Sequence, residues 1–155
     1  MLSNNATIAE NRRARFDYFV QDTSEAGIML TGTEVKSLRL GQCSLNEGHV
    51  APNRAGEIFL YNVQISEYQQ AGQHLQHDPK RARKLLLHGK EVQKLIGAVT
   101  REGYTIVPLR LFFNARGKVK IEIALAKGKK LYDKRETEKK RDWGREKAKI
   151  MKQKD

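Results

Sequence analysis

The sequence has a single cysteine, three prolines and no long apolar run, and these shortages exclude several classes of protein. One cysteine, Cys43, cannot form an internal disulfide, so a disulfide-stabilised secreted scaffold is excluded. No apolar stretch approaches the roughly 20 residues that a membrane-spanning helix needs. Residues 1–16 also lack the apolar stretch of a secretory signal. We therefore expect a protein of the reducing cytoplasm that is not inserted in a membrane.

Motifs for catalysis are also missing from the sequence. There is no glycine-rich phosphate loop, no cysteine pair and no nucleophile elbow, so we predict no enzyme, no catalytic residue and no cofactor. Cys43, His74 and His77 are too dispersed for the usual spacing of zinc ligands, so no metal is predicted. Glu25 and Glu34 could form a carboxylate pair for metal-assisted RNA cleavage. Helix capping, pairing with arginine or hydrogen bonding to bases fits these two residues better.

Acidic residues are scarce relative to basic ones. The chain has 18 Asp and Glu against 30 Lys and Arg, which gives a net charge of +12 and a pI near 9.9. The imbalance is concentrated in residues 127–155, where 13 Lys and Arg stand against 6 Asp and Glu. A cationic segment of this kind is typical of a protein that binds a polyanion, either nucleic acid or an anionic membrane surface.

The cationic segment has too few apolar side chains to form a core of its own. Its main apolar residues are Tyr132, Trp143, Ile150 and Met151, which cannot offset the conformational entropy lost on ordering. We therefore predict a tail that is disordered when free and becomes helical on RNA, as its charges replace counterions on phosphates. A solubilising tail is the alternative, but the one-sided charge and the exposed apolar residues argue against it.

The apolar pattern predicts a mainly β fold: a small antiparallel barrel of the oligonucleotide-binding (OB) type with peripheral helices. Strict alternation is clearest over residues 118–125, after a turn at 114–117. Because strands and helices do not alternate one for one, a parallel sheet is not expected. The other predicted strands are 16–20, 27–31, 49–51, 57–65 and 104–113, and the predicted helices are 33–40, 79–87 and 91–99. The predicted domains are a flexible N-terminus (1–10), the barrel (11–127) and the basic tail (128–155).

Basic residues within the barrel domain are further candidates for phosphate contacts. Arg12, Arg13 and Arg15 form a short cluster, although a solvated N-terminal run is the simpler interpretation. The basic block 80–84 lies on the first turns of a predicted helix, where positive charge is unfavourable next to the positive end of the helix dipole. A bound anion would offset this repulsion. Lys118 and Lys120 are predicted on the solvent face of the last strand, where lysines also prevent edge-to-edge aggregation.

Several long blocks of this sequence resemble one family. NRRARFDYF, EAGIMLTGTEVKSLRLG, GEIFLYNVQIS, HDPKRARKLLLH and LAKGKKLYDKRE, in this order, are similar to the SsrA-binding protein (SmpB) family of bacterial trans-translation. The similarity runs from about Ala6 to Lys152. It implies an OB-type barrel with a C-terminal tail, and a non-catalytic protein. Such a protein binds the tRNA-like domain of transfer-messenger RNA (tmRNA, SsrA RNA) and delivers it to stalled ribosomes. The tail is expected to enter the empty mRNA channel at the decoding centre and become helical there.

The resemblance also implies which residues act. Glu25 is expected as an acceptor for base or ribose donors, with a structural hydrogen bond to the helix start as the alternative. One of the three consecutive leucines 85–87 is expected to be exposed and free to pack on RNA. Gly128 is expected to be a hinge between barrel and tail. The RNA-binding residues implied are Asn11, Arg13, Glu25, Thr33, Glu34, Lys36, Leu86, His88 and Lys118. The ribosome-contacting residues implied are Gly128, Lys129, Lys130, Tyr132, Asp133, Lys134, Arg135, Trp143, Ile150 and Met151.

The expected partners are tmRNA and the ribosome, chiefly small-subunit rRNA near the decoding centre, and no membrane. Nothing in the sequence argues for a closed oligomer, so a monomer is expected. The triplet Gln42-Cys43-Ser44 departs from the family, which has a lysine there, and this weakens any phosphate contact at that turn. A ribosomal protein or general RNA chaperone with the same barrel and tail is the alternative function.

Overall fold

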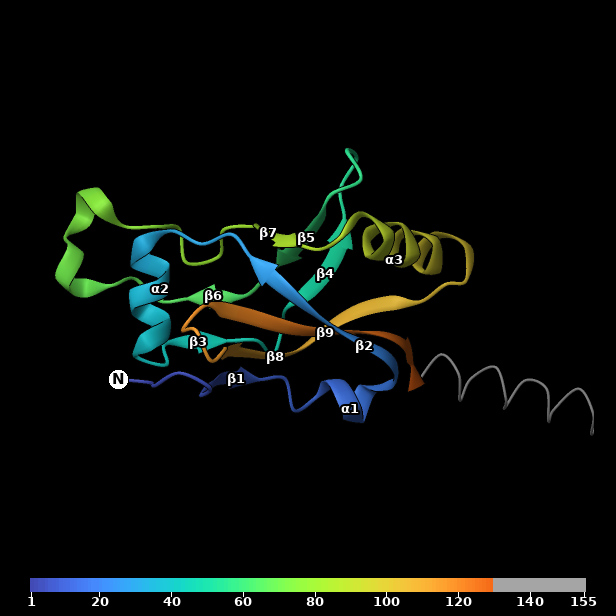
Figure 1. Cartoon of the computed structure of the whole chain (residues 1–155), viewed down its shortest axis with the longest axis horizontal. Coiled ribbons are helices and arrows are strands. Elements are labelled where there is room, and N and C mark those ends of the chain that lie inside the picture. The colour runs from blue at the N-terminus through green and yellow to red at the C-terminus, as the bar shows by residue number, and fades with distance from the viewer. Residues whose placement is uncertain (130–155) are drawn as a thin grey trace, which may run out of the picture.

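The strands form a closed antiparallel barrel (Figure 1). Successive neighbours around it are β8-β4-β5-β7-β2-β9, and β9 pairs back with β8, which closes the ring. Strand β1 pairs with β8 at its outer edge, and β3 pairs with β6 in a separate small sheet. The computed structural model describes residues 1–129. The strands are β1 (Thr7–Glu10), β2 (Tyr18–Ile28), β3 (Cys43–Ser44), β4 (His49–Pro52), β5 (Ile58–Tyr61), β6 (Gln64–Ile65), β7 (Arg83–Leu86), β8 (Thr105–Phe113) and β9 (Val119–Gly128).

The long β8–β9 hairpin confirms the strongest alternation in the sequence. Its turn is held by the Asn114 side chain, whose Oδ1 accepts from the amides of Arg116 (3.0 Å) and Lys118 (2.9 Å). Gly117 completes the turn with a φ of +79°, a conformation that glycine adopts without strain. The predicted antiparallel barrel with peripheral helices is therefore confirmed.

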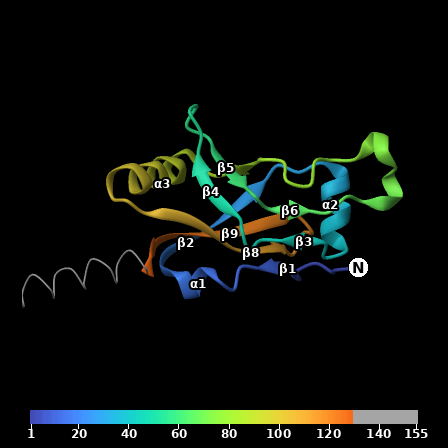
Figure 2. The ribbon, with the colours of Figure 1, turned by 180° about the vertical axis from the view of Figure 1, so that it is seen from behind.

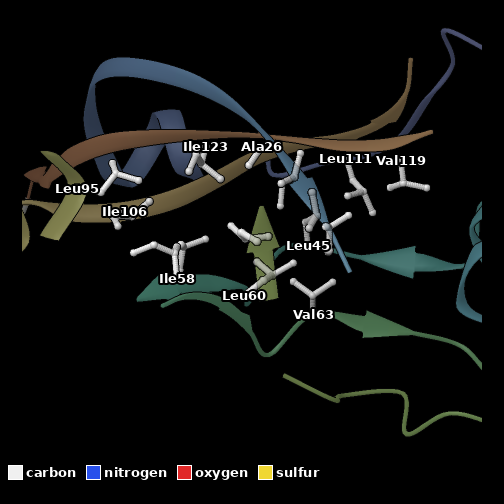
Figure 3. Close-up of a cluster of buried hydrophobic side chains, with 14 of the residues drawn as sticks. Ala26, Leu45, Ile58, Leu60, Val63, Leu95, Ile106, Leu111, Val119 and Ile123 are labelled. Carbon is white, nitrogen blue, oxygen red and sulfur yellow. The ribbon is translucent and has the colours of Figure 1, made fainter. Parts of the chain in front are cut away.

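The core fills the inside of the barrel (Figure 3). Every second side chain of a strand points into the barrel and contributes to this core. Examples are Ile121 and Ile123 from β9 and Leu60 from β5, which are all fully buried. Burying one such side chain contributes about 1.5–3 kcal/mol. A smaller apolar cluster lies on the outside of the β8–β9 hairpin, and this second cluster contains Ala14, Val107, Leu109, Ala124 and Ala126.

Within residues 1–129, the barrel is surrounded by α1 (Ala14–Asp17), α2 (Gly32–Arg39) and α3 (Gly89–Arg101), with short 3-10 turns at Gln69–Ala71 and Gln73–Leu75. Helices α2 and α3 lie at opposite ends of the molecule, as both views show (Figures 1 and 2). Ala14 of α1 covers the second cluster, and Leu95 of α3 reaches the main core. Among residues 1–129, no helix is long and apolar enough to span a membrane.

The helix predicted over 79–87 is wrong, because residues 83–86 form strand β7. Asp78 begins a turn rather than a helix: its Oδ1 accepts from the Lys80 amide, and its carbonyl accepts from the Arg81 amide. The next residues then alternate, with Arg83 buried inside the barrel and Leu86 exposed. A four-residue strand is too short to show a period that distinguishes it from a helix, so its pairing with β5 and β2 decides the structure.

The N-terminus predicted as flexible over 1–10 contains a strand in its last four residues. Residues Thr7–Glu10 form β1, whose Ile8 and Ala9 pack against the main core. The Leu2 amide donates to the Arg39 carbonyl (2.6 Å), and the Arg39 guanidinium donates back to the Leu2 carbonyl (2.9 Å). The strand predicted over 16–20 begins later, because α1 occupies its first residues, and β2 then runs unbroken into the second predicted strand.

Candidate nucleic-acid interface

Glu34, one of the predicted RNA-binding residues, is held in a buried ion-pair network. Its side chain is fully buried, as is that of Arg83, whose Nε lies 2.5 Å from Glu34 Oε2. Glu34 Oε1 accepts from Arg81 Nη2 (2.6 Å) and from the Thr31 amide (2.8 Å), which completes a capping box at the start of α2. Burial raises the pKa of Glu34, but the hydrogen bonds from Arg81, the Thr31 amide and Arg83 outweigh it and lower the pKa to about 2.

The predicted RNA contact of Glu34 is therefore wrong. Its carboxylate is committed to two arginines and a helix amide, so it can neither reach RNA nor pair with Glu25 around a metal. The capping of α2 also excludes the alternative role considered for Glu25, a structural hydrogen bond to the start of that helix. The amides at the start of α2 are capped by Thr31 and Glu34, whereas Glu25 is exposed in the middle of β2.

The basic block 80–84 does not lie on a helix, and three of its four cations are held in ion pairs. Arg83 is fully buried, and its Nη1 donates to the Val63 carbonyl (2.7 Å). Arg81 is held on Glu34, and Lys84 lies 2.6 Å from Glu57. Hydrogen bonds from Lys84 and Asn53 lower the pKa of Glu57. Lys80 is the one cation of the block that is exposed and forms no ion pair within residues 1–129. Most of the positive charge of the block therefore stabilises the fold.

The outer face of β7, β2 and β9 brings an apolar and a cationic side chain together over a glycine. Gly27 of β2 lies opposite Leu86 on one side and opposite Lys120 on the other. A Cβ atom at Gly27 would lie 3.2 Å from Leu86 Cβ and 3.7 Å from Lys120 Nζ. Glycine therefore leaves room for both side chains. Leu86 is 51% exposed while Leu85 is buried, so the expectation of one exposed leucine is confirmed.

Glu25 lies on this same face, two residues before Gly27. It is opposite Glu122 of β9, and like charges at directly opposed positions repel each other. Arg110 of β8 reduces this repulsion by pairing with Glu122, its Nε lying 3.6 Å from Glu122 Oε2. The Arg110 guanidinium also lies 4.1 Å from the centre of the Phe112 ring. The face thus presents an exposed carboxylate, an exposed leucine and a half-buried lysine side by side. We call the set Glu25, Gly27, Leu86 and Lys120 the β2 face.

The other two predicted RNA-binding residues of α2, Thr33 and Lys36, lie at the same end of the molecule as Glu34. The Thr33 hydroxyl is 2.8 Å from Nδ1 of the buried His77, so part of its role is structural. Lys36 is exposed, and its Nζ lies 5.6 Å from the centre of the Tyr68 ring. Of the two, Lys36 is the fully exposed one, and it presents a positive charge at the surface.

The remaining predicted RNA-binding residues are spread along the barrel. Lys118 is exposed at the β8–β9 turn, and His88 is exposed at the start of α3, close in sequence to Leu86. Asn11 and Arg13 lie beside α1, where Asn11 Nδ2 donates to the Pro108 carbonyl (3.0 Å) and Arg13 is exposed. From Lys118 to the end of β9 the strand spans roughly 30 Å at 3.3 Å per residue. The predicted RNA-binding residues therefore lie at several separate places on the barrel and do not form one cluster.

Three residues of the β2 face and its border were not on the predicted list: Gly27, Lys120 and Glu122. Lys120 was expected on the solvent side of the last strand, and this is confirmed. Gly27 and Glu122 belong to the site only because of the register between β2 and β9. The alternating sequence assigns Glu122 to the solvent face, but it gives no information on which strand lies beside it.

The weak metal set considered from the sequence is not assembled. His77 Nε2 donates to the Ile65 carbonyl (2.8 Å), which leaves Nδ1 to accept from Thr33 in the neutral ring. Burial raises the pKa of Cys43 to about 12, so its thiol stays neutral and is a poor ligand. Within the part of the chain that the structure describes, no group of three or more His, Cys, Asp or Glu residues is placed to hold a metal.

The end of β9 shows where the tail begins. Gly128 lies opposite Tyr18 within the β2–β9 ladder and does not adopt a positive φ. The hinge expected at this residue stays a prediction. Lys129 follows as the last described residue. The other residues predicted to contact the ribosome lie outside the described residues: Lys130, Tyr132, Asp133, Lys134, Arg135, Trp143, Ile150 and Met151.

Comparisons with known proteins agree with this architecture. A family model described as SmpB protein matches residues 8–153. The chain belongs to the SmpB family. Proteins named SsrA-binding protein from Rhodopseudomonas palustris (60% identical), Bradyrhizobium diazoefficiens (59%) and Afipia carboxidovorans (58%) each match it over 144 residues. These matches cover 93% of this chain and 90% of each relative.

A solved structure supports the SmpB-family fold. It is described as "tmRNA-SmpB: a journey to the center of the bacterial ribosome", and one of its chains is 48% identical to this one. The two superimpose with a TM-score of 0.64, over 77% of this chain and 82% of that chain.

Proposed function

We propose that this protein binds the tRNA-like domain of tmRNA and delivers it to stalled ribosomes for trans-translation. The observation that carries the proposal is the family match over residues 8–153, which includes both the barrel and the basic tail. Its relatives are named for binding SsrA, and the similar solved structure is named for tmRNA, SmpB and the ribosome. The protein acts by binding and catalyses no reaction. Because its partners are cytoplasmic RNAs, it works in the cytoplasm.

The β2 face is the part of the barrel best suited to tmRNA. A folded RNA presents 2′-hydroxyls, base edges and unstacked bases as well as phosphates. Glu25 accepts hydrogen bonds from hydroxyl or amino donors, Leu86 packs on a base or ribose, and Lys120 neutralises a phosphate. His88 and Lys118 extend this surface at its two sides, and Lys36 adds a charge at the end occupied by α2.

The tail supplies the second half of the function. A vacant mRNA channel is lined by rRNA phosphates, which attract residues 127–155 with their excess of basic side chains. The barrel then carries specificity for tmRNA, while the tail detects that the channel is empty.

Binding to isolated RNAs tests this division. Full-length protein and protein lacking residues 131–155 are titrated at physiological salt with the tRNA-like domain of tmRNA and with ordinary tRNA of equal length. We expect a strong preference for the tRNA-like domain in both proteins. Equal binding of both RNAs that disappears with the tail would favour a general RNA-binding protein instead.

Substituting Glu25→Arg is expected to weaken binding to the tRNA-like domain about tenfold, the size of a lost hydrogen bond to a charged acceptor. The barrel is not expected to lose stability, because an arginine here faces Glu122 instead of repelling it. Fluorescence anisotropy and thermal unfolding measure the two effects. Glu102→Arg adds the same charge at the exposed end of α3 and is expected to leave affinity unchanged or slightly higher. Unchanged affinity of Glu25→Arg would assign Glu25 no direct contact.

The neighbouring leucines of β7 give opposite expectations. Leu86→Ala is expected to reduce affinity for the tRNA-like domain about fivefold with little loss of stability, because Leu86 is half exposed. Leu85→Ala is expected to destabilise the fold by about 2–5 kcal/mol, since it opens a cavity in the core. RNA affinity of the folded Leu85→Ala protein is expected to stay unchanged. A loss of affinity in Leu85→Ala equal to that in Leu86→Ala would remove Leu86 from the interface.

A further inference from the structure

Two lysines at the end of β9 are held by aromatic rings. Lys127 Nζ lies 4.6 Å from the centre of the Tyr104 ring, and Lys129 Nζ lies 5.3 Å from the centre of the Phe19 ring. Lys129 Nζ also donates to the Arg15 carbonyl of α1 at 3.1 Å. Both lysines lie within a residue of Gly128, where the barrel ends and the tail follows.

The rings that hold these lysines are themselves fixed by different elements. Tyr104, just before β8, donates from its hydroxyl to Gln21 Oε1 at 2.9 Å. Gln21 lies where the β2–β9 register shifts between Val20 and Thr23, so its side chain is free of the regular ladder pattern. Phe19 lies in β2 itself, opposite Lys127. The end of β9 is therefore tied to β2, to α1 and to the start of β8.

Holding the two lysines on these rings costs free energy, and the stability of the fold does not explain why that cost is accepted. Phe19 is 41% exposed, and each ordered lysine gives up the rotamer freedom of a long side chain. Lysines at a strand end that served only solubility would be left mobile in water.

We propose that Phe19 and Tyr104 are positioning residues for the tail. By holding Lys127 and Lys129 they fix the position of the end of β9, to which the tail is joined, while the β2 face is engaged with tmRNA. This inference rests on the proposed function. A fixed starting point reduces the conformational freedom that the tail loses on entering a narrow channel, which favours entry.

The test separates ring contacts from charge. The variant Phe19→Leu with Tyr104→Leu keeps the net charge and much of the apolar volume but removes both rings. The matched control, Phe19→Tyr with Tyr104→Phe, keeps both rings while it moves the hydroxyl from residue 104 to residue 19 and so removes the bond to Gln21. Each full-length protein is assayed for affinity to the tRNA-like domain, for the folded fraction by circular dichroism, and for peptide tagging on ribosomes stalled on an mRNA lacking a stop codon.

We expect the leucine variant to bind the tRNA-like domain within twofold of the unaltered protein and to tag about tenfold more slowly, as expected from losing two cation–π contacts. The ring-preserving control is expected to tag at close to the unaltered rate. Equal tagging by the leucine variant would overturn the proposal and leave the contacts a role in stability only. If the unaltered protein neither bound the tRNA-like domain nor supported tagging, the proposed function would fail instead.

Discussion

A protein ending at Lys130 is expected to bind the tRNA-like domain of tmRNA with little loss of affinity and to support no tagging of stalled ribosomes. The β2 face lies entirely within the barrel, so removing residues 131–155 leaves Glu25, Leu86 and Lys120 in place. The removed residues carry much of the positive charge proposed to follow the rRNA phosphates of the channel. Anisotropy measures the affinity, and a reconstituted translation reaction measures the tagging.

A tail of the same composition in scrambled order is the control for this truncation. It keeps the charge but moves Tyr132, Trp143, Ile150 and Met151 to other positions. If the aromatic and apolar residues act at defined places, the scrambled tail supports no tagging; if charge alone acts, it restores tagging. A truncated protein that still tags would contradict the proposed role of the tail altogether.

Substituting Arg83→Leu is expected to destabilise the barrel by about 3–5 kcal/mol, the usual consequence of removing one partner of a buried ion pair. The change leaves Glu34 fully buried with its Oε2 unpaired, and it also removes the donor to the Val63 carbonyl. Urea unfolding at neutral pH measures the loss. Lys84→Met is the matched control, because its partly exposed pair with Glu57 is screened by solvent and is expected to contribute under about 1 kcal/mol. Equal losses in the two variants would mean that burial of the Arg83 pair does not matter.

The same network predicts how stability depends on pH. The pKa of Glu34 is about 2 in the folded protein against an ordinary 4.5, so the unfolded chain takes up a proton first as pH falls. The stabilisation is therefore complete above pH 4.5 and is lost as pH falls through the folded pKa. Its size is about 3 kcal/mol, at 1.36 kcal/mol per unit of pKa shift. Urea unfolding from pH 6 to pH 2 is expected to show this loss in the unaltered protein and a shallower one in Glu34→Gln; identical slopes would exclude Glu34 as the titrating group.

The sequence by itself determined the features that depend on local pattern or composition. Alternation over 118–125 predicts a half-buried strand, and the short turn at 114–117, set by Asn114 and Gly117, makes its pairing with the strand before it antiparallel. Helix α2 was predictable because Thr31 and Glu34 have the spacing of a capping box. The net charge of the tail, and the long blocks shared with the SmpB family, also require no coordinates.

The tertiary structure decided everything that depends on which distant residues become neighbours. The same residues 80–87 suit a short helix or a strand, and only the open edges of β5 and β2 select the strand. Glu34 and Arg83 both suggest RNA contacts when taken singly, yet they neutralise each other inside the barrel because the fold brings them 2.5 Å apart. Gly27 becomes part of the β2 face only when β7 and β9 place Leu86 and Lys120 on either side of it. Burial and strand register are properties of the closed barrel, so a chain of residue types cannot specify them one position at a time.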